Sequence, residues 1–397
     1  MKALSIVSES AINESESAIR QVGHCAFEAF IYEEAAAVRG MSVNNKSRAT
    51  LADVASRAGV SPVTVSRAIR HPEMVSEELR LRIDDAVRTL NYIPNHLASA
   101  LASTRTHIVG VIVPSLTNGV FDDYLAAIQD VFNPAGLQIL VSNVRYSEVE
   151  EEKAIQTLLG YHPEAMIVTG VDQTERSRQM LRNSGVPVVQ TMDVTSTPID
   201  LNIGLDHSAA GAAAVHYLHD QGHRKIAHLT ARGDPRARRR HAGYRRAMEE
   251  LGLYDERLVE ASPAISTVEM GGKQLATVLE RVPGVSAVFT CNDDLALGTL
   301  FECERRGLRV PEDVAIVGFN DLDFCIASVP TLTSVSTERH KMGTWAAESI
   351  LEIIRGSGKR PRATQVDVGF SIKKRGSTAH TPGSSASAPK RKTKAKV

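Results

Sequence analysis

Seven short apolar runs, each followed by a segment of helical length, constrain the fold of this chain more than any other feature. The runs are rich in Val and Ile and begin at or next to His107, Leu137, Ala165, Pro187, Arg224, Ser286 and Val314. Continuous apolar runs of this kind are typical of strands buried on both faces of a parallel sheet. Because they are too many for one simple sheet and the pattern restarts near residue 205, we expect a two-lobed α/β domain over residues 107–372.

Residues 46–93 show a different pattern, that of three short amphipathic helices with strong capping signals. Thr50–Asp53 has the sequence of a capping box, and Gly59 suits the left-handed end of a first helix. Ser61–Pro62 then suits the start of a second helix, and Ser76 the start of a third. The expected core residues are Leu51, Val54, Ala55, Ala58, Val65, Ile69, Leu79, Ile83, Val87 and Leu90. The pattern predicts a small all-α domain with a helix-turn-helix, although an ordinary helical hairpin shares it.

The outward face of the second helix carries small, hydrogen-bonding side chains that suit the major groove of DNA. Arg67 can bond bidentately to guanine, and Pro62 and Val63 can contact thymine methyl groups. The hydroxyl groups nearby are placed for phosphates. The residues expected at the DNA-binding surface are Thr50, Ser61, Pro62, Val63, Thr64, Ser66 and Arg67.

Basic residues are concentrated locally, although the formal net charge is zero. Residues 1–45 hold three Lys and Arg against six Asp and Glu, residues 46–107 hold nine against six, and residues 371–397 hold eight against none. Local basicity suits a modular nucleic-acid binder. We expect residues 1–45 to be a disordered N-terminal extension, with Met41 a second candidate start, and residues 373–397 to be a disordered basic tail. This tail either adds salt-sensitive DNA affinity or is a solvated segment of no consequence.

Other classes of protein lack support in the sequence. The four cysteines are scattered without Cys-x-x-Cys spacing, which indicates structural thiols in a reducing cytoplasm. No apolar stretch is long enough for a membrane span or a secretory signal. Because no phosphate-binding glycine motif or nucleophile elbow is present, we expect neither enzyme activity nor a cofactor. A metal site is the alternative to a solvated helix end for His216, His219, His223 and His228.

Several stretches resemble the lactose-repressor (LacI) family of bacterial transcription factors. They are Thr50-Leu-Ala-Asp-Val-Ala, Ala58-Gly-Val-Ser, Thr64-Val-Ser-Arg, Leu90-Asn-Tyr-Ile-Pro-Asn, Asn292-Asp and Val317-Gly-Phe-Asn-Asp, spread over about residues 48–378. Within the family, Ser61–Arg67 and Asn91–Thr106 look most like gluconate-utilisation repressors. The resemblance implies a homodimer on a pseudo-palindromic operator and an α/β core related to periplasmic binding proteins.

The resemblance also implies that residues 94–106 form a hinge helix between the two domains. Asn95 can cap this helix, Ala98 lies where hinge helices pack closely, and Leu101 falls where the family inserts a leucine into the minor groove. A helix of barely two turns is unstable alone in water. We therefore expect it to fold against its twin on the operator, the alternative being that Leu101 packs on its own domain.

By the same resemblance, the cleft of the α/β domain binds a small sugar acid such as gluconate or a phosphorylated derivative. Arg240 matches an arginine that holds a sugar hydroxyl or carboxylate. Asn320 stands where many members have Asp, and the lost negative charge favours an anionic ligand. The expected effector-binding residues are Ser115, Phe121, Asp193, Asp206, Arg240, Asn292 and Asn320. A solvated arginine cluster over Arg236–Arg240 and an N-cap at Asn292 are the alternatives.

Together these features predict a DNA-binding transcriptional regulator, most simply a repressor, whose operator affinity is controlled allosterically by a sugar acid. Control by a protein partner in place of a sugar is one alternative. A sugar-modifying enzyme with a fused DNA-binding domain is another.

Overall fold

The computed structural model describes residues 49–94, 105–231, 233–356 and 364–379. The expectations for residues 1–45, for Asn95, Ala98 and Leu101, and for the tail from residue 380 lie outside the described residues. The chain divides between Ser99 and Ala100 into two compact units. No helix in the described ranges is long and apolar enough to cross a membrane.

The first unit is the expected three-helix domain. It consists of α2 (Leu51–Ala58), α3 (Pro62–Arg70), the 3-10 helix η1 (Pro72–Met74) and α4 (Glu77–Thr89). α2 packs against both α3 and α4, so that three short helices share one small core. The third helix thus provides the apolar surface that two short helices alone cannot bury.

The predicted caps in this unit are confirmed. Thr50 and Asp53 exchange the reciprocal hydrogen bonds of a capping box. Gly59 ends α2 in the left-handed conformation at φ 65°. The Ser61 hydroxyl accepts the backbone N–H of Thr64 at the start of α3. Each cap satisfies a backbone group that a helix end leaves without a partner.

The expected core is confirmed except at one position. Val54, Val65 and Ile83 are almost completely buried. Ile69 was expected to point inward, but its side chain is 37% exposed and Ala68 is buried instead. Ala68 and Ile69 lie on opposite sides of Val65 around α3, and the side that faces the small core is that of Ala68.

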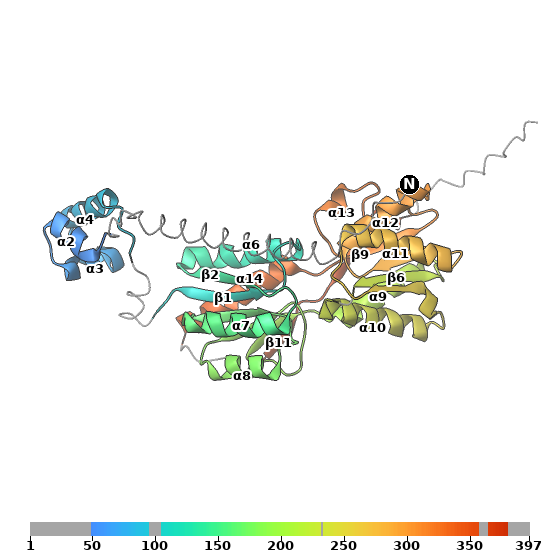
Figure 1. Ribbon diagram of the computed structural model, residues 1–397, viewed down its shortest axis with the longest axis horizontal. Coiled ribbons are helices and arrows are strands. Elements are labelled where there is room, and N and C mark those ends of the chain that lie inside the picture. The colour runs from blue at the N-terminus through green and yellow to red at the C-terminus, as the bar shows by residue number, and fades with distance from the viewer. Residues whose placement is uncertain (1–48, 95–104, 232, 357–363, 380–397) are drawn as a thin grey trace, which may run out of the picture. The chain divides into compact units, whose positions relative to one another are not determined.

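The second unit is the expected pair of α/β lobes (Figure 1). The sheet of the first lobe contains, in spatial order, β11 (Thr364–Asp367), β5 (Leu201–Gly204), β4 (Val188–Thr191), β3 (Ala165–Thr169), β1 (Ile108–Val113) and β2 (Gln138–Asn143). All neighbouring strands in it are parallel. Its helices are α6 (Val120–Phe132), the short η2 (Asn133–Ala135), α7 (Glu148–Gly160), α8 (Glu175–Asn183) and α14 (Arg339–Arg355). α6 packs with α14, and α7 packs with α8.

The second lobe has a sheet of the same size. In spatial order it contains β12 (Ser371–Lys373), β10 (Thr333–Ser336), β9 (Ala315–Asn320), β8 (Ala287–Thr290), β6 (Ile226–Ala231) and β7 (Val259–Ser262). Only β12 runs antiparallel to its neighbour. Its helices are α9 (His207–Asp220), α10 (Pro235–Glu250), η3 (Glu256–Leu258), α11 (Val268–Arg281), α12 (Asp293–Arg306) and α13 (Phe324–Ala327). α9 packs with α10, and α11 packs with α12.

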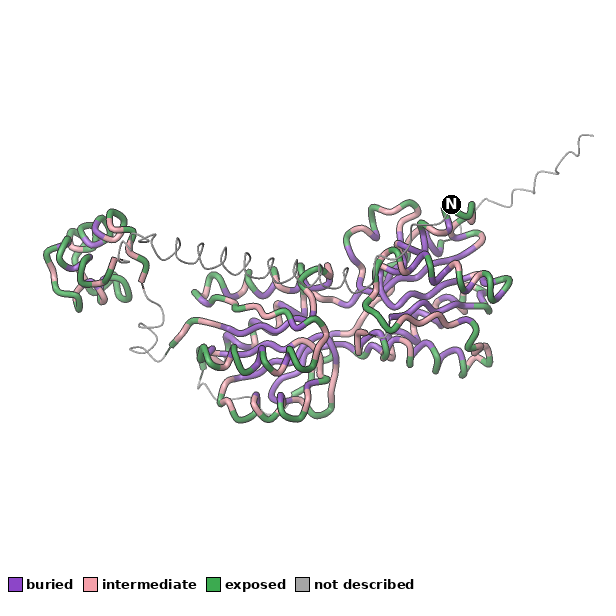
Figure 2. The backbone as a smooth tube through the Cα atoms, in the orientation of Figure 1, coloured by how far each residue is buried: buried purple, intermediate pink, exposed green. Residues whose placement is uncertain are grey.

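The order of the elements places strand ends at the junction of the lobes. The chain passes from β5 to α9, from β10 to α14 and from β11 to β12 as it changes lobes within the described residues. The central strands form the buried core of each lobe, with exposed residues on the helices outside (Figure 2). Ligands of parallel sheets bind beyond the carboxyl ends of the strands. The topology therefore directs a ligand site to the cleft between the lobes.

The folded domain extends beyond its expected end at residue 372. Ser377 is fully buried, and its carbonyl accepts the backbone N–H of Ile316. Its hydroxyl donates to the carbonyl of Ile316, and the Thr378 hydroxyl lies 2.7 Å from that of Thr333. The prediction that the disordered tail begins at residue 373 is therefore wrong, because these bonds tie residues 373–379 to the second lobe.

Candidate DNA-binding surface and ligand cleft

The exposed side of α3 carries the side chains expected to meet DNA. A shallow hollow on this unit is lined by Leu51, Pro62, Val63, Ser66, Arg67, Arg70, His71 and Met74. Val63 is 67% exposed, so its side chain is open to contact from outside the unit. Arg70 donates to the Ser66 hydroxyl at 2.6 Å. Four of the predicted contacts, Pro62, Val63, Ser66 and Arg67, thus share one surface.

The other predicted DNA contacts also serve the local structure. The Thr50 hydroxyl donates to Asp53 Oδ2 at 2.7 Å. The Ser61 and Thr64 hydroxyls lie 2.9 Å apart at the first turn of α3. All three lie at the starts of helices, where backbone N–H groups and hydroxyls commonly meet phosphates. Their contact with DNA remains a prediction.

In the second unit, a buried hollow lies between the lobes. It is lined by Asn118, Val120, Phe121, Met192, Leu205, His207, Asp234, Arg236, Arg240, Asn292, Asn320 and Thr337. Four of the seven expected effector residues, Phe121, Arg240, Asn292 and Asn320, are therefore brought together. We call this space the inner hollow.

The remaining three expected residues lie outside the inner hollow and make other contacts. The Ser115 hydroxyl accepts the backbone N–H of Asn118, which does line the hollow. Asp206 caps α9 by accepting the N–H groups of Ser208 and Ala209. Asp193 pairs with an arginine of the other lobe, as described below. Sequence position alone placed these side chains near the cleft but could not show which way they point.

Arg240 is the most buried cation of the inner hollow and is held by neutral groups. Its Nε donates to Nδ1 of His207 at 3.1 Å, and its Nη1 donates to the carbonyl of Cys291. The guanidinium carbon lies 3.9 Å from the centre of the Phe319 ring. Burial, and then the positive charge of Arg240, lower the pKa of His207 well below its usual value. His207 is therefore neutral, donates Nε2–H to the carbonyl of Met192 and accepts from Arg240.

A second arginine of the hollow was missed from the sequence. Arg236 is buried, and its Nε donates to Asp234 Oδ1 at 3.0 Å. The guanidinium also lies 5.6 Å from the centre of the Phe121 ring. Asp234 caps α10 just after β6, and this position at a strand end was the available signal. Although burial opposes it, the charges of Arg236 and Arg240 lower the pKa of Asp234, so that this carboxylate stays ionised.

The two predicted asparagines of the hollow, Asn292 and Asn320, make backbone contacts. Asn292 caps α12, as the alternative interpretation predicted, and also donates to the hydroxyl of Ser266. Asn320 has φ 112°, a conformation in which asparagine is commoner than most residues. Its carbonyl accepts from Arg339 Nη1 at 2.6 Å. The Arg339 Nε lies 3.3 Å from Asp123 Oδ2 on α6, so Arg339 ties Asn320 to the first lobe.

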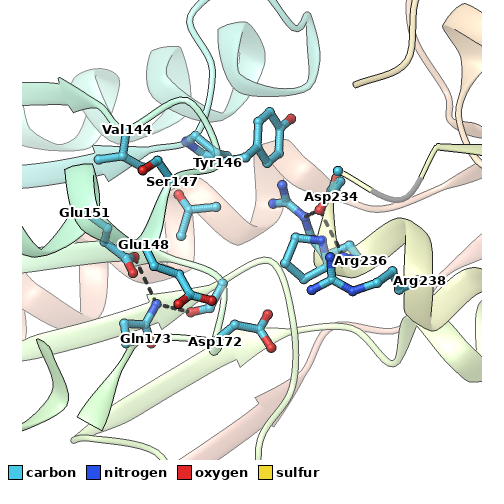
Figure 3. Close-up of a pocket in the computed structure, with 15 residues that line it drawn as sticks. Val144, Tyr146, Ser147, Glu148, Glu151, Asp172, Gln173, Asp234, Arg236 and Arg238 are labelled. Atoms are coloured by element: carbon cyan, nitrogen blue, oxygen red, sulfur yellow. Dashed lines mark hydrogen bonds and ion pairs between the residues drawn. The ribbon is translucent and has the colours of Figure 1, made fainter. Parts of the chain in front are cut away.

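A second, more open hollow continues from the inner one, and we call it the outer hollow. The two hollows share Asp234 and Arg236. In Figure 3, Glu148, Glu151 and Asp172 of the first lobe face Asp234, Arg236 and Arg238 of the second. Gln173 Nε2 donates to Glu151 Oε1 at 3.2 Å and to the carbonyl of Gly170. Burial raises the pKa of Glu151 to about 7.

The histidines that suggested a metal site make other contacts. His228 is fully buried between the rings of Tyr244 and Phe289, at 4.6 and 4.9 Å between centroids. His223 Nδ1 lies 3.0 Å from the Ser286 hydroxyl. In the part of the chain that the structure describes, no three His, Cys, Asp or Glu side chains are grouped to hold a metal ion.

Comparison with known proteins agrees with this division of the chain. A family model described as bacterial regulatory proteins, lacI family, matches residues 50–95, and a periplasmic binding protein-like domain matches residues 215–378. The chain is 44% identical over 331 residues to HTH-type transcriptional regulator GntR of Pseudomonas aeruginosa, a match that covers 83% of this chain and 96% of that protein. It is 37% identical over 334 residues to GntR of Escherichia coli K12, over 84% of this chain and 99% of that protein.

A solved structure gives the same result for the fold. The lac repressor dimer bound to operator and the anti-inducer ONPF matches with a TM-score of 0.72 and 26% identity. The match covers 84% of this chain and 100% of that chain. The predicted architecture, a helix-turn-helix domain with a two-lobed α/β domain, is thereby confirmed.

Proposed function

Because the chain belongs to the LacI family of bacterial regulatory proteins, we propose that it represses transcription as a homodimer on a pseudo-palindromic operator, under the control of a small sugar acid. The DNA would be read by α3, with Arg67 on a guanine and Pro62 and Val63 on thymine methyl groups. Residues 94–106 would form the paired hinge helices.

The observation that carries the effector proposal is the buried Arg240 in the inner hollow. Its hydrogen-bonding partners are the neutral His207 ring and a backbone carbonyl, so its charge is not cancelled by a carboxylate bonded to it. Arg236 adds a second cation that already has Asp234 as its partner. A buried guanidinium beside asparagine amides suits a ligand with one carboxylate and several hydroxyl groups.

Gluconate is the first ligand to test, because the subgroup resemblance of Ser61–Arg67 and Asn91–Thr106 is to gluconate-utilisation repressors. A hollow that is polar and closed by both lobes favours a small ligand over control by a protein partner, which would need an exposed surface. In this proposal the ligand bridges the two lobes, and its effect reaches the hinge helices through the first lobe, where the described part of the second unit begins at Arg105.

Footprinting of full-length protein on DNA fragments selected by the protein itself tests the proposal. We expect gluconate, 6-phosphogluconate or a related ketogluconate to weaken protection of the operator. A mannitol control, which has the hydroxyl groups without the carboxylate, should leave protection unchanged. Protection that responds to none of the sugar acids would refute control by this ligand class. Recovery of a phosphocarrier protein in a pull-down would then select the protein-partner alternative.

A further inference from the structure

One arginine joins the two lobes beside the cleft without lining either hollow. Arg239 of α10 bonds bidentately to Asp172, with Nη1 and Nη2 at 2.9 and 2.6 Å from the two carboxylate oxygens. Its Nη1 also lies 2.9 Å from Asp193 Oδ2. Asp172 follows β3 and Asp193 follows β4, so both carboxylates belong to the first lobe, whereas Arg239 belongs to the second.

Asp193 is fixed to the first lobe and depends on Arg239 for a counter-charge. Its side chain is almost completely buried, and its Oδ1 accepts the backbone N–H of Val194. Its carbonyl accepts from Asn202 Nδ2 at 2.7 Å, and Gly204 lies so close that a Cβ there would be 2.2 Å from that carbonyl oxygen. Burial raises the pKa of Asp193 to about 6. A carboxylate buried without its partner is costly, so separation of the lobes is penalised at this point.

The residues next to this ion-pair cluster line the inner hollow on both sides. Met192 precedes Asp193, and Arg240 follows Arg239. His207 connects these two by accepting from Arg240 and donating to the carbonyl of Met192. A shift of the lobes that broke the Arg239 contacts would therefore also move the groups that surround a ligand.

We propose that Arg239, Asp172 and Asp193 form an interlobe latch that holds the cleft closed and slows the release of the bound effector. Arg239 is in this sense a positioning residue, because it acts through closure of the lobes and not through contact with the ligand. The inference about release rests on the proposed effector function. The inference about closure does not rest on the effector function, because the ion pairs lie within the chain and involve no ligand.

Stopped-flow measurement of gluconate binding to the full-length protein tests the first part. For Arg239→Gln we expect gluconate to dissociate about five to ten times faster with little change in the association rate, because broken charge pairs act mainly on release. Asp172→Asn, at a half-exposed position, should speed dissociation less, because Arg239 keeps its ion pair with Asp193. The double variant should be no worse than Arg239→Gln alone, since Arg239→Gln already removes the contact with Asp172. For Arg239→Lys we expect a dissociation rate between those of wild type and Arg239→Gln, because lysine keeps the charge and loses the bidentate geometry.

Arg246→Gln is the matched control. Arg246 lies on the same helix and is paired within its own lobe with Glu250 at 3.8 Å. It should leave both rates unchanged. Unchanged dissociation in Arg239→Gln, or additive effects in the double variant, would overturn the latch.

A ligand-free measurement separates failure of the latch from failure of the proposed effector. Spin labels at Lys153→Cys on α7 and Lys273→Cys on α11 report the distance between the lobes, and both positions are well exposed. With Cys25 replaced by Ser, we expect one narrow distance distribution in the wild type and a broader, longer one in Arg239→Gln. Identical distributions would overturn the proposal. If wild-type protein binds no sugar acid but the distributions differ, the effector assignment fails and the latch stands.

Discussion

At the scale of single residues, Arg240 is the side chain on which effector binding depends most in this account. We expect Arg240→Gln to weaken gluconate binding at least about tenfold, because the variant removes the buried positive charge that faces the carboxylate. Titration calorimetry on the full-length protein checks this, with thermal unfolding to show that the variant is folded. Arg245→Gln is the control. Arg245 is exposed and paired with Glu249 on the same helix, so this variant should bind gluconate as wild type does.

Arg240 also stabilises the fold, so its effect on gluconate binding has to be measured in a variant that is shown to be folded. Its loss leaves Nδ1 of His207 and the carbonyl of Cys291 without their donor, which costs about 1 to 3 kcal/mol. Equal gluconate affinity in a folded Arg240→Gln variant would show that the ligand carboxylate lies elsewhere.

Glu151 gives a second test at this scale, through the dependence of stability on pH. Burial raises the pKa of Glu151 to about 7, above its ordinary 4.5. The folded state binds the Glu151 proton more tightly than the unfolded state does. Its contribution to the free energy of unfolding is therefore complete below about pH 4.5 and is lost as the pH rises through 7. Glu151→Gln removes this loss, so we expect it to gain up to about 3 kcal/mol of unfolding free energy relative to wild type between pH 5 and 8.

Denaturant unfolding at several pH values measures this difference. Glu150→Gln on the same helix is the control, since the Glu150 side chain is 53% exposed and paired with Lys153. It should follow the pH dependence of wild type. If Glu151→Gln follows it too, the carboxyl of Glu151 is not the buried acid described above.

At the scale of secondary-structure elements, the start of α3 depends on the cap at Ser61. We expect Ser61→Ala to destabilise the first turn of α3 by about 1 kcal/mol, because the backbone N–H of Thr64 loses its side-chain acceptor. Hydrogen exchange of the Thr64 and Val65 amides in the full-length protein should then be about five times faster. Ser56→Ala, in the middle of α2 and exposed, should not change these amides.

The proposed hinge is tested at this scale as well. We expect amides of residues 95–102 to exchange more slowly in the operator complex than in free protein, because two short helices need one another and the bent duplex to persist. Leu101→Ala should reduce this protection and the operator affinity, whereas Leu116→Ala, at an exposed position of the second unit, should change neither. Equal exchange with and without operator would contradict the hinge proposal.

The sequence predicted elements well where the apolar pattern is long or the caps are specific. All seven apolar runs became strands, and the caps at Thr50, Gly59 and Ser61 form as expected. β7, β10 and β12 escaped prediction because charged residues or hydroxyl groups interrupt each of them, so that no continuous apolar run shows. β12 and the bonds of Ser377 depend on a partner strand distant in sequence.

The cleft was predicted less completely, for a reason that is also local. The family resemblance indicated Phe121, Arg240, Asn292 and Asn320, which line one hollow. Asn292 and Asn320 also lie where β8 and β9 end, and polar residues at the ends of buried parallel strands share one edge of a sheet. Side-chain direction is set by tertiary contacts, so Asp206 became a helix cap and Asp193 an interlobe ion pair. Arg236 belongs to the cluster for which a solvated helix face was the alternative interpretation, yet its side chain is buried and paired with Asp234.

At the scale of the whole molecule, one chain carries both the proposed DNA-binding unit and a cleft whose two walls come from different lobes. Coupling between two sites is a free energy, and it acts equally in both directions. If gluconate weakens operator binding by some factor, operator must weaken gluconate binding by the same factor. Typical couplings of 1 to 3 kcal/mol correspond to about 5-fold to 150-fold.

The affinity of the full-length protein for gluconate, measured with and without saturating operator DNA, tests this coupling most directly. The account predicts that gluconate binds at least about fivefold more weakly to the operator complex, and that a DNA of unrelated sequence has a much smaller effect. The same affinity for gluconate in free and operator-bound protein would contradict it.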